Sequence, residues 1–136
     1  MSKPIIYQML PRLWGNDTTT PSKDGCLAEN GTGKFSDIDV NTLEYLKWLG
    51  CSHVWYTGII RHSTQESEQG CIPSHPQFVK GKAGSPYAIC DYFDVNAYLA
   101  DDPQRRMDEF EALVERTHKS GLKVIIDFVP NHVSRD

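Results

Sequence analysis

The chain has 136 residues, a mass of 15.4 kDa, 39% hydrophobic residues and a formal net charge of −4. This length and composition allow one modest core, so we expect a globular chain and not a disordered one. Its lysines and arginines are scattered along the sequence, which argues against nucleic acid and anionic membrane as partners.

The first predicted strand is residues 5–10, I-I-Y-Q-M-L, a short apolar run of the kind that is buried on both faces. A loop rich in Gly, Asn, Asp and Thr follows, to about residue 35. The sequence S-D-I-D at residues 36–39 then resembles a capping box that opens a helix, and Gly50 is placed to end it. Helical spacing puts five residues on the inner face of this helix: Ile38, Thr42, Tyr45, Leu46 and Leu49.

Two further strands and a second helix follow. Residues 52–56, S-H-V-W-Y, predict the second strand. The region of about residues 57–86 is too long for a plain connection, which indicates a functional loop or a small inserted lobe. Asp102 and Pro103 begin the second helix, which ends at Gly121. Residues 123–128, K-V-I-I-D-F, predict the third strand.

Three apolar strands separated by two helices indicate an α/β fold with a parallel sheet. A sheet of three parallel strands buries little, whereas a TIM (β/α)8 barrel needs about 250 residues. We therefore expect residues 1–136 to form the first three β/α units of a truncated barrel. Because an open sheet leaves an unpaired edge and an uncovered face, we expect self-association through that edge.

The acid at Asp127 closes the third strand, where a carboxylate is costly to bury unless it is paired or faces a polar site. Active sites of barrels lie at such carboxyl ends of strands. Pro130 disfavours helix before it, so we expect Asn131 and His132 to be extended, with side chains on opposite sides, one for a metal and one for a ligand. Composition supports equally a polar turn in which Asn131 caps the chain and His132 is solvated.

The four cysteines, Cys26, Cys51, Cys71 and Cys90, have no C-x-x-C pairing and no histidine at zinc-ligand spacing, which argues against a structural metal site. We expect Cys51 and Cys90 to be small buried hydrophobes. A disulfide between Cys26 and Cys71 stays an alternative to free thiols.

No apolar run approaches the roughly 20 residues of a membrane span, and no signal peptide follows Met1. The sequence therefore predicts a soluble chain. It leaves open whether that chain is cytoplasmic or is exported after removal of a signal.

The sequence D-F-V-P-N-H at residues 127–132 resembles the D-x-x-x-N-H stretch at the end of the third barrel strand in the α-amylase family of glycoside hydrolases. Other segments that resemble the family follow its order, at residues 6–12, 33–38 and 50–55. Residues 84–92, G-S-P-Y-A-I-C-D-Y, are similar to the family's G-Y-x-x-x-D-Y stretch. The resemblance implies the N-terminal part of a catalytic barrel that acts on α-linked glucans such as starch or maltodextrin.

The resemblance also implies roles for four residues. Tyr87 would stack on the sugar ring, His132 would hydrogen-bond the sugar, Asp127 would support the floor of the site, and Asn131 would ligate a structural calcium. A tyrosine ring against a pyranose face supplies apolar contact and leaves the hydroxyls free. The alternative for Tyr87 is an ordinary packed loop tyrosine.

Calcium is the one cofactor that the resemblance implies, and no organic cofactor is expected. The residues that complete the Asn131 site in the family would lie beyond Asp136, and one side-chain oxygen does not hold a calcium ion. Some members carry a second, acid-rich calcium loop after the first strand. Here N-G-T-G-K at residues 30–34 includes a lysine, which disfavours calcium there, although Asn16 and Asp17 keep oxygen ligands available.

The family cuts its substrate by a retaining mechanism with two carboxylates, which come from later strands. None of the 18 acids of this chain stands in an equivalent position, so we expect the segment alone to be inactive. Two alternatives stay open, because the residues that decide them would lie downstream. One is a non-catalytic sugar-binding relative of the fold, and the other is a related transglycosylase or isomerase.

Overall fold

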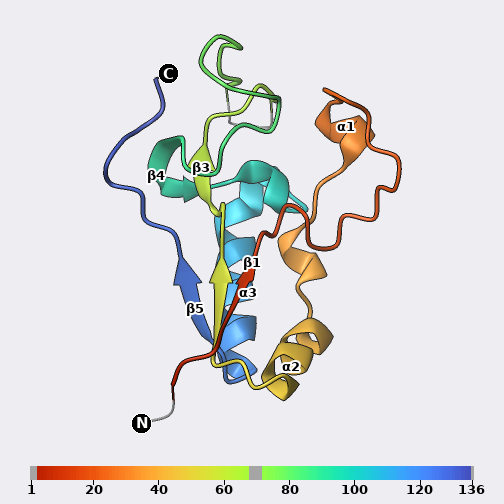
Figure 1. The fold of residues 1–136 in the computed structure, drawn as a ribbon, viewed down its shortest axis with the longest axis vertical. Coiled ribbons are helices and arrows are strands. Elements are labelled where there is room, and N and C mark those ends of the chain that lie inside the picture. Colours follow the sequence, from red (N-terminus) through yellow and green to blue (C-terminus); the bar gives the residue numbers. More distant parts are fainter. Residues whose placement is uncertain (1–2, 68–71, 136) are drawn as a thin grey trace.

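The structure is a computed structural model that describes residues 3–67 and 72–135. Figure 1 shows a small sheet with helices beside it and long loops above it. The elements in chain order are β1 (Ile6–Met9), α1 (Leu27–Asn30), η1 (Phe35–Asp37), α2 (Val40–Trp48), β2 (His53–Tyr56), β3 (Ile60–His62), β4 (Ile89–Val95), η2 (Ala97–Leu99), η3 (Pro103–Arg105), α3 (Arg106–Lys119) and β5 (Lys123–Ile126), where η denotes a 3-10 helix.

The main sheet has three parallel strands in the order β1-β2-β5. Met9 pairs with Tyr56, and Tyr56 pairs with Ile126, so the three strands end level with one another. The parallel α/β arrangement predicted from the three apolar runs is therefore confirmed. Each strand stops before the polar residues that follow it, and these residues gather at one end of the sheet.

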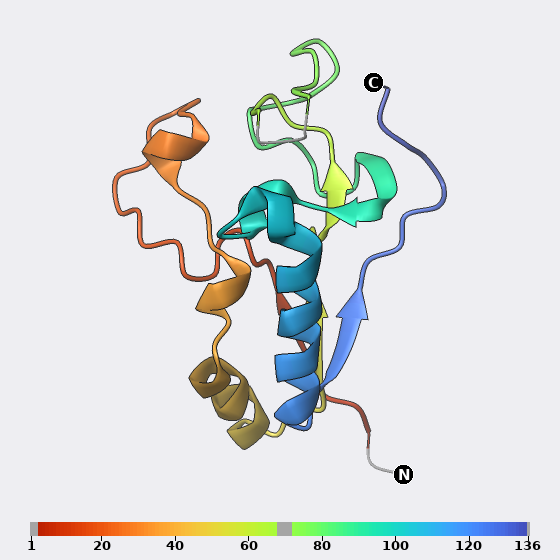
Figure 2. The same ribbon diagram turned by 180° about the vertical axis from the view of Figure 1, so that it is seen from behind.

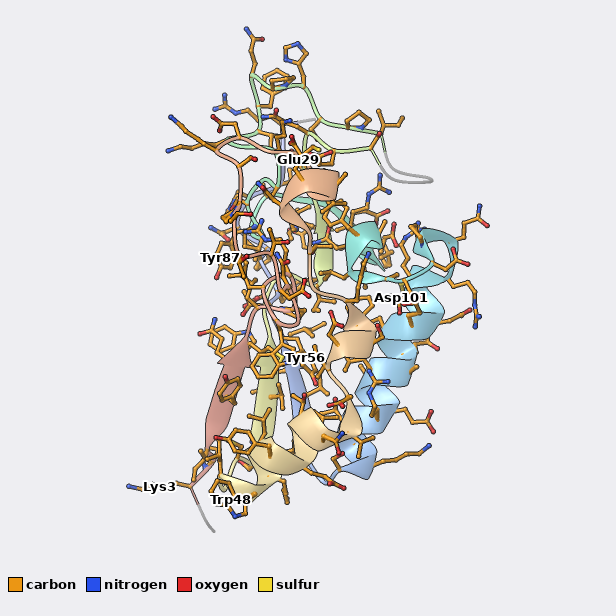
Figure 3. The ribbon with its side chains drawn as sticks, turned by 90° about the vertical axis from the view of Figure 1, so that its right-hand side faces the viewer. Lys3, Glu29, Trp48, Tyr56, Tyr87 and Asp101 are labelled. Atoms are coloured by element: carbon orange, nitrogen blue, oxygen red, sulfur yellow. The ribbon has the colours of Figure 1, made fainter. Side chains whose placement is uncertain are left out.

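Helices α2 and α3 lie on the same face of the main sheet (Figure 2), and the side view separates strands from helices clearly (Figure 3). Helix α2 begins later than predicted: its N-cap is Asp39, whose Oδ1 accepts a hydrogen bond of 2.8 Å from the Thr42 amide. Gly50 and Gly121 follow the two helices with φ of 87° and 75°, which glycine adopts without a Cβ clash. No helix within the two described ranges is long and apolar enough to cross a membrane.

The buried residues of α2 are Leu43 and Leu46. Tyr45 and Leu49, which helical spacing placed on the inner face, are 55% and 45% exposed. That prediction was wrong because Ile38, which anchored the expected face, lies before the helix begins.

The core lies between these helices and one face of the sheet, because alternate residues of a strand point to opposite faces. Tyr7 and Met9 of β1, with Val54 and Tyr56 of β2, belong to this core. The Tyr56 hydroxyl and Thr117 Oγ1 of α3 form a buried hydrogen bond of 2.7 Å. The opposite face, which no described helix covers, carries Ile6, Gln8, His53, Trp55, Lys123 and Ile125.

An antiparallel pair, β3 with β4, stands beyond the carboxyl ends of the main sheet (Figure 1). It was not predicted: β3 lies within the expected long loop, and β4 includes part of the segment that resembles the family before its second helix. Strand β3 has three residues, and the pairing is irregular on both sides of Arg61. Such a short, bulged pair leaves almost no alternating pattern in the sequence.

Candidate sugar-binding site

Polar side chains gather at the carboxyl ends of the parallel strands, on the face that the helices leave uncovered. Gln8 of β1 donates a hydrogen bond from Nε2 to Oγ1 of Thr57, at 3.0 Å. Trp55 of β2 donates one from Nε1 to Oδ1 of Asp127, at 2.9 Å. These two cross-strand bonds join the ends of all three strands. Active sites of barrel folds are built at this end.

Asp127 is held in one orientation by Trp55. Its second oxygen, Oδ2, is buried and has no hydrogen-bond partner among the described residues. A buried carboxylate oxygen without a partner costs free energy, which is a common mark of a ligand-binding position. Sequence reasoning singled out Asp127 and missed Trp55, although Trp55 and Asp127 lie on the same face of their strands by the period of two.

Tyr87 lies beyond the ends of the strands, on the loop between β3 and β4 (Figure 3), and it is 43% exposed. Glycine is required at Gly84, three residues earlier, because φ is +66° and a Cβ there would lie 1.9 Å from the Ser63 carbonyl oxygen. The Ser63 amide donates to the Ala88 carbonyl at 3.0 Å. The Tyr87 loop is therefore fastened to the end of β3 on both sides of the tyrosine.

The Tyr87 loop also rests on His62, a buried residue that sequence reasoning did not single out. Asn96 donates from Nδ2 to His62 Nδ1 at 2.9 Å, and His62 Nε2 donates to the Ala83 carbonyl at 3.2 Å. Burial lowers the pKa of His62, and the nearby charge of Arg12 lowers it further, whereas the backbone hydrogen bonds act in the opposite direction. The lowered pKa favours the neutral imidazole, and the tautomer with its proton on Nε2 matches both the Asn96 donor and the Ala83 carbonyl.

The segment after β5 continues beyond the end of the main sheet and passes beside the β3–β4 pair (Figure 1), where the Ser134 amide donates to the Ile89 carbonyl at 2.8 Å. Pro130 and Asn131 form a turn instead of the predicted extended backbone, and both Asn131 and His132 are exposed. The Tyr92 hydroxyl donates to the carbonyl of Val129 and lies 3.3 Å from the carbonyl of His132. The structure thus brings Tyr87, Asp127 and His132 to the same end of the molecule. No hydrogen bond joins their side chains to one another within the described ranges.

The calcium prediction for Asn131 rests on a single exposed side-chain oxygen, whereas calcium takes six to eight oxygen ligands. The described residues contain no group of three or more His, Cys, Asp or Glu side chains that could hold a metal ion. The residues present here therefore do not fit a calcium ion by themselves.

The loop after β1 is held by amide side chains and by a lysine. Asn16 donates from Nδ2 to the Asn30 carbonyl at 3.0 Å, and Asn30 Oδ1 accepts from the Ser22 amide at 2.8 Å. The Lys34 ammonium donates to the carbonyls of Tyr98 and Ala100, both at 2.9 Å. Lys34 thus places a positive charge at the point where this loop meets η2.

Several acidic side chains form ion pairs or accept hydrogen bonds from backbone amides. Burial tends to raise the pKa of Asp94, but the hydrogen bond from Arg106 and the charges of Arg106 and Arg61 outweigh it and hold the pKa below its usual range. Glu109 accepts from the amides of Asp101 and Asp102 at 2.8 Å. These carboxylates stabilise the fold and are not arranged as a catalytic pair.

Of the cysteines, Cys51 is buried as predicted, at 7% exposure. Cys90 is exposed, which contradicts the expectation of a buried hydrophobe: it occupies a β4 position that points away from the core. Its Sγ lies 3.6 Å from the Arg61 carbonyl. The proposed pairing of Cys26 with Cys71 falls outside the described residues, because Cys71 is not among them.

Comparison with known proteins extends this description. Trehalose-6-phosphate hydrolase of Bacillus subtilis (strain 168) is 32% identical over 107 residues, which are 79% of this chain and 15% of that protein. Trehalose synthase of Pimelobacter sp. (strain R48) is 29% identical over 104 residues, covering 76% and 14%. The amino acid transporter heavy chain SLC3A1 of Homo sapiens is 28% identical over 106 residues, covering 78% and 12%.

Solved structures agree on the fold. The crystal structure of Bacillus licheniformis trehalose-6-phosphate hydrolase, in its R201Q mutant, matches with a TM-score of 0.59 and 29% identity. The match covers 96% of this chain and 17% of that one. Our chain thus spans less than a fifth of the length of these relatives. The family model for the catalytic domain of α-amylase matches residues 22–136. The chain therefore belongs to the α-amylase family of glycoside hydrolases, as a segment of its catalytic domain.

Proposed function

We propose that this chain forms the first three β/α units of the catalytic barrel of a retaining glycoside hydrolase that acts on α-linked glucans, and that it holds the sugar without cleaving it. The observation that carries the proposal is the Trp55–Asp127 hydrogen bond of 2.9 Å at the carboxyl ends of β2 and β5. It places an oriented carboxylate on the uncovered face of the sheet, which would be the interior of a closed barrel.

Three side chains would contact the sugar. The exposed ring of Tyr87 offers an apolar face to a pyranose ring, while the ring hydroxyls stay available for hydrogen bonds. Asp127 uses Oδ1 to accept from Trp55, which leaves Oδ2 to accept from a sugar hydroxyl or from a neighbouring residue of the barrel. His132 is exposed on the same end of the molecule and can donate or accept a hydrogen bond.

The segment would not cleave a glycosidic bond alone. Retaining hydrolysis needs a nucleophilic carboxylate and a carboxylic acid about 5–5.5 Å apart, on either side of the bond. Two of the acids of this chain are already engaged: Asp94 pairs with Arg106, and Glu109 accepts from two backbone amides.

A non-catalytic role is the second candidate. The human relative at 28% identity is named as a heavy chain of an amino acid transporter, whereas the two trehalose relatives are named as a hydrolase and a synthase. A parent protein of the first kind would use this surface for contact with a partner. Binding of a glucan at Tyr87 would favour an enzyme as the parent protein over a partner subunit.

Calorimetric titration of the chain with maltotriose tests the proposal, together with an assay for released reducing ends. We expect binding in the millimolar range without any release of reducing sugar. Tyr87→Ala should weaken binding about tenfold, because it removes the stacking face. The control is Tyr45→Ala on α2, which should leave binding unchanged. Tyr45 has a similar exposure, and its ring stacks on Trp48, which lies at the end of the sheet opposite Tyr87 (Figure 3). Release of reducing sugar by the unmodified chain would contradict the proposal that residues 1–136 do not include the catalytic carboxylates.

A further inference from the structure

The imidazole of His62 connects β3 to the loop that carries Tyr87. His62 is the last residue of β3, is 6% exposed, and lies where the loop of residues 63–88 begins (Figure 1). Its Nε2 lies 3.2 Å from the Ala83 carbonyl of that loop. Pro86, the residue before Tyr87, lines a cavity of about 30 Å³ together with His62. The ring therefore meets the loop at two places shortly before the tyrosine.

Asn96 determines which nitrogen of the ring carries the proton. Its side chain is buried, and its amide nitrogen donates to the Gly58 carbonyl and to His62 Nδ1, both at 2.9 Å. Because an N–H of the ring cannot face an N–H of the amide, Nδ1 must accept, and Nε2 keeps the proton that it donates to Ala83. Only the neutral ring satisfies both contacts at once.

A second proton on His62 would disrupt this arrangement. The proton would lie on Nδ1, where it meets the N–H of Asn96 instead of an acceptor, and the Ile60 carbonyl is 3.4 Å away, longer than a usual hydrogen bond. Turning the amide of Asn96 over would bring its oxygen against the Gly58 carbonyl. Turning the ring instead would give up the hydrogen bond to Ala83. Each way of relieving the conflict loosens a contact that holds the loop.

The surroundings of His62 offer no negative charge to stabilise an imidazolium. Arg12 from the loop after β1 lines the cavity of about 30 Å³, and Arg61 of β3 lines a second cavity of about 20 Å³ that also borders His62. The other titratable groups there are Cys90 of β4 and Tyr98 of η2, and no described carboxylate lines either cavity. Burial, and to a smaller extent the charge of Arg12, lowers the pKa of His62, although backbone hydrogen bonds act in the opposite direction.

We propose that His62 is the positioning residue of the stacking tyrosine. Neutral His62 holds the loop so that Tyr87 meets the sugar, whereas protonated His62 releases the loop and weakens glucan binding. The inference rests on the proposed function and adds a control by pH to the same site. Because His62 is buried, it reaches the ligand only through Tyr87.

The test is the affinity for maltotriose as a function of pH, measured by NMR titration over the range in which circular dichroism shows each protein to be folded. For the unmodified chain we expect the affinity to fall up to about tenfold as pH drops below about 6.5, because stacking on Tyr87 is lost. His62→Gln offers the same donor and acceptor but cannot be protonated. It should bind as the unmodified chain does at neutral pH and should lose the pH dependence.

Two other histidines serve as controls. His75→Gln changes an exposed histidine of the same loop, whose ring contacts Phe78, and it should alter neither the affinity nor its pH dependence. His132→Gln removes a proposed sugar contact, so it should lower the affinity at every pH and preserve the dependence. The ¹⁵N signals of the His62 ring in the unmodified chain give a second readout: the ring should titrate at the pH at which the affinity falls.

The outcomes separate this inference from the proposed function. A pH dependence that is equal in His62→Gln and the unmodified chain, or that disappears in His132→Gln, would overturn the positioning role and leave the proposed function standing. If His62→Gln does not fold, the unmodified chain decides: a His62 ring that titrates without any change in affinity overturns the positioning role as well. If maltotriose binds at no pH, the proposed function fails and this inference fails with it.

Discussion

At the scale of single residues, Asp127 and His62 are each held by a side chain that is distant in the sequence, Trp55 and Asn96 respectively. The sequence singled out Asp127 because a carboxylate at the end of an apolar strand is costly to bury unless it is paired or faces a polar site. Its partner Trp55 lies 72 positions away in the chain, and only the register of β2 with β5 brings the two side chains together. His62 gave no signal in the sequence, since a lone histidine in a polar loop resembles any solvated one.

His62 leads to a prediction about pH. Its folded-state pKa is lowered by burial, so the unfolded chain binds more protons than the folded chain as pH falls below about 6.5. The stabilisation from neutral His62 is complete above that pH and is lost as pH falls towards the folded-state pKa. Asp94, whose pKa is also lowered, acts in a separate window: its stabilisation is lost only below about pH 4.

We expect the free energy of unfolding of the unmodified chain to fall between pH 7 and pH 5 by up to about 1.4 kcal/mol per pH unit from this one group. Urea unfolding at several pH values measures it. His62→Gln should flatten the pH dependence in this range, whereas His118→Gln, at an exposed position on α3, should preserve it. Parallel pH profiles for His62→Gln and the unmodified chain would show that His62 is not the titrating group.

At the scale of elements, the parallel strands and the two longer helices could be predicted, because each has a run or a spacing of apolar residues long enough to be read. The β3–β4 pair could not. It is held by loop contacts such as Gly84 against Ser63 and the Asn96–His62 hydrogen bond, and such contacts leave no periodicity. The sequence singled out Tyr87 by the family resemblance, but the contacts that hold its loop could not be predicted.

Lys34 links the loop after β1 to η2, and its removal should be costly. Lys34→Met would leave the carbonyls of Tyr98 and Ala100 without this donor, and both residues are buried. We expect a loss of about 1–3 kcal/mol in the free energy of unfolding. Lys47→Met is the matched control, because Lys47 donates to the carbonyl of the exposed Gly121. Equal losses in the two variants would contradict the role assigned to Lys34.

Two glycines of the Tyr87 loop region allow a paired test. Gly84 and Gly81 both have positive φ, but a Cβ at Gly84 would strike the Ser63 carbonyl, whereas one at Gly81 would meet nothing within 4 Å. Gly81→Ala should therefore cost about 1–2 kcal/mol from backbone strain alone. Gly84→Ala should cost clearly more and should also weaken maltotriose binding, because the loop that carries Tyr87 must move. A Gly84→Ala protein as stable as Gly81→Ala would refute the packing described here.

At the scale of the whole molecule, no described helix covers one face of the sheet. The outer edges of β1 and β5 have no described partner strand. Apolar side chains are exposed beside them: Ile5, Ile6 and Ile126 are 41–52% exposed, and Phe128 is 72% exposed. Unpaired strand edges with exposed apolar residues beside them favour strand pairing between copies of the chain. Light scattering coupled to size-exclusion chromatography should therefore show a mass that rises with protein concentration, and a constant monomer mass would contradict this expectation.

The central claim is that this chain contributes the sugar-holding end of an α-amylase barrel. The most direct measurement is a titration of the ¹⁵N-labelled chain with maltotriose, followed by two-dimensional NMR. We predict shifts of amide signals around Tyr87 and in residues 127–132, with the signals of α2 and of the outer side of α3 unmoved. Maltotriose that shifts no signals, or that shifts mainly those of the helices, would contradict the claim.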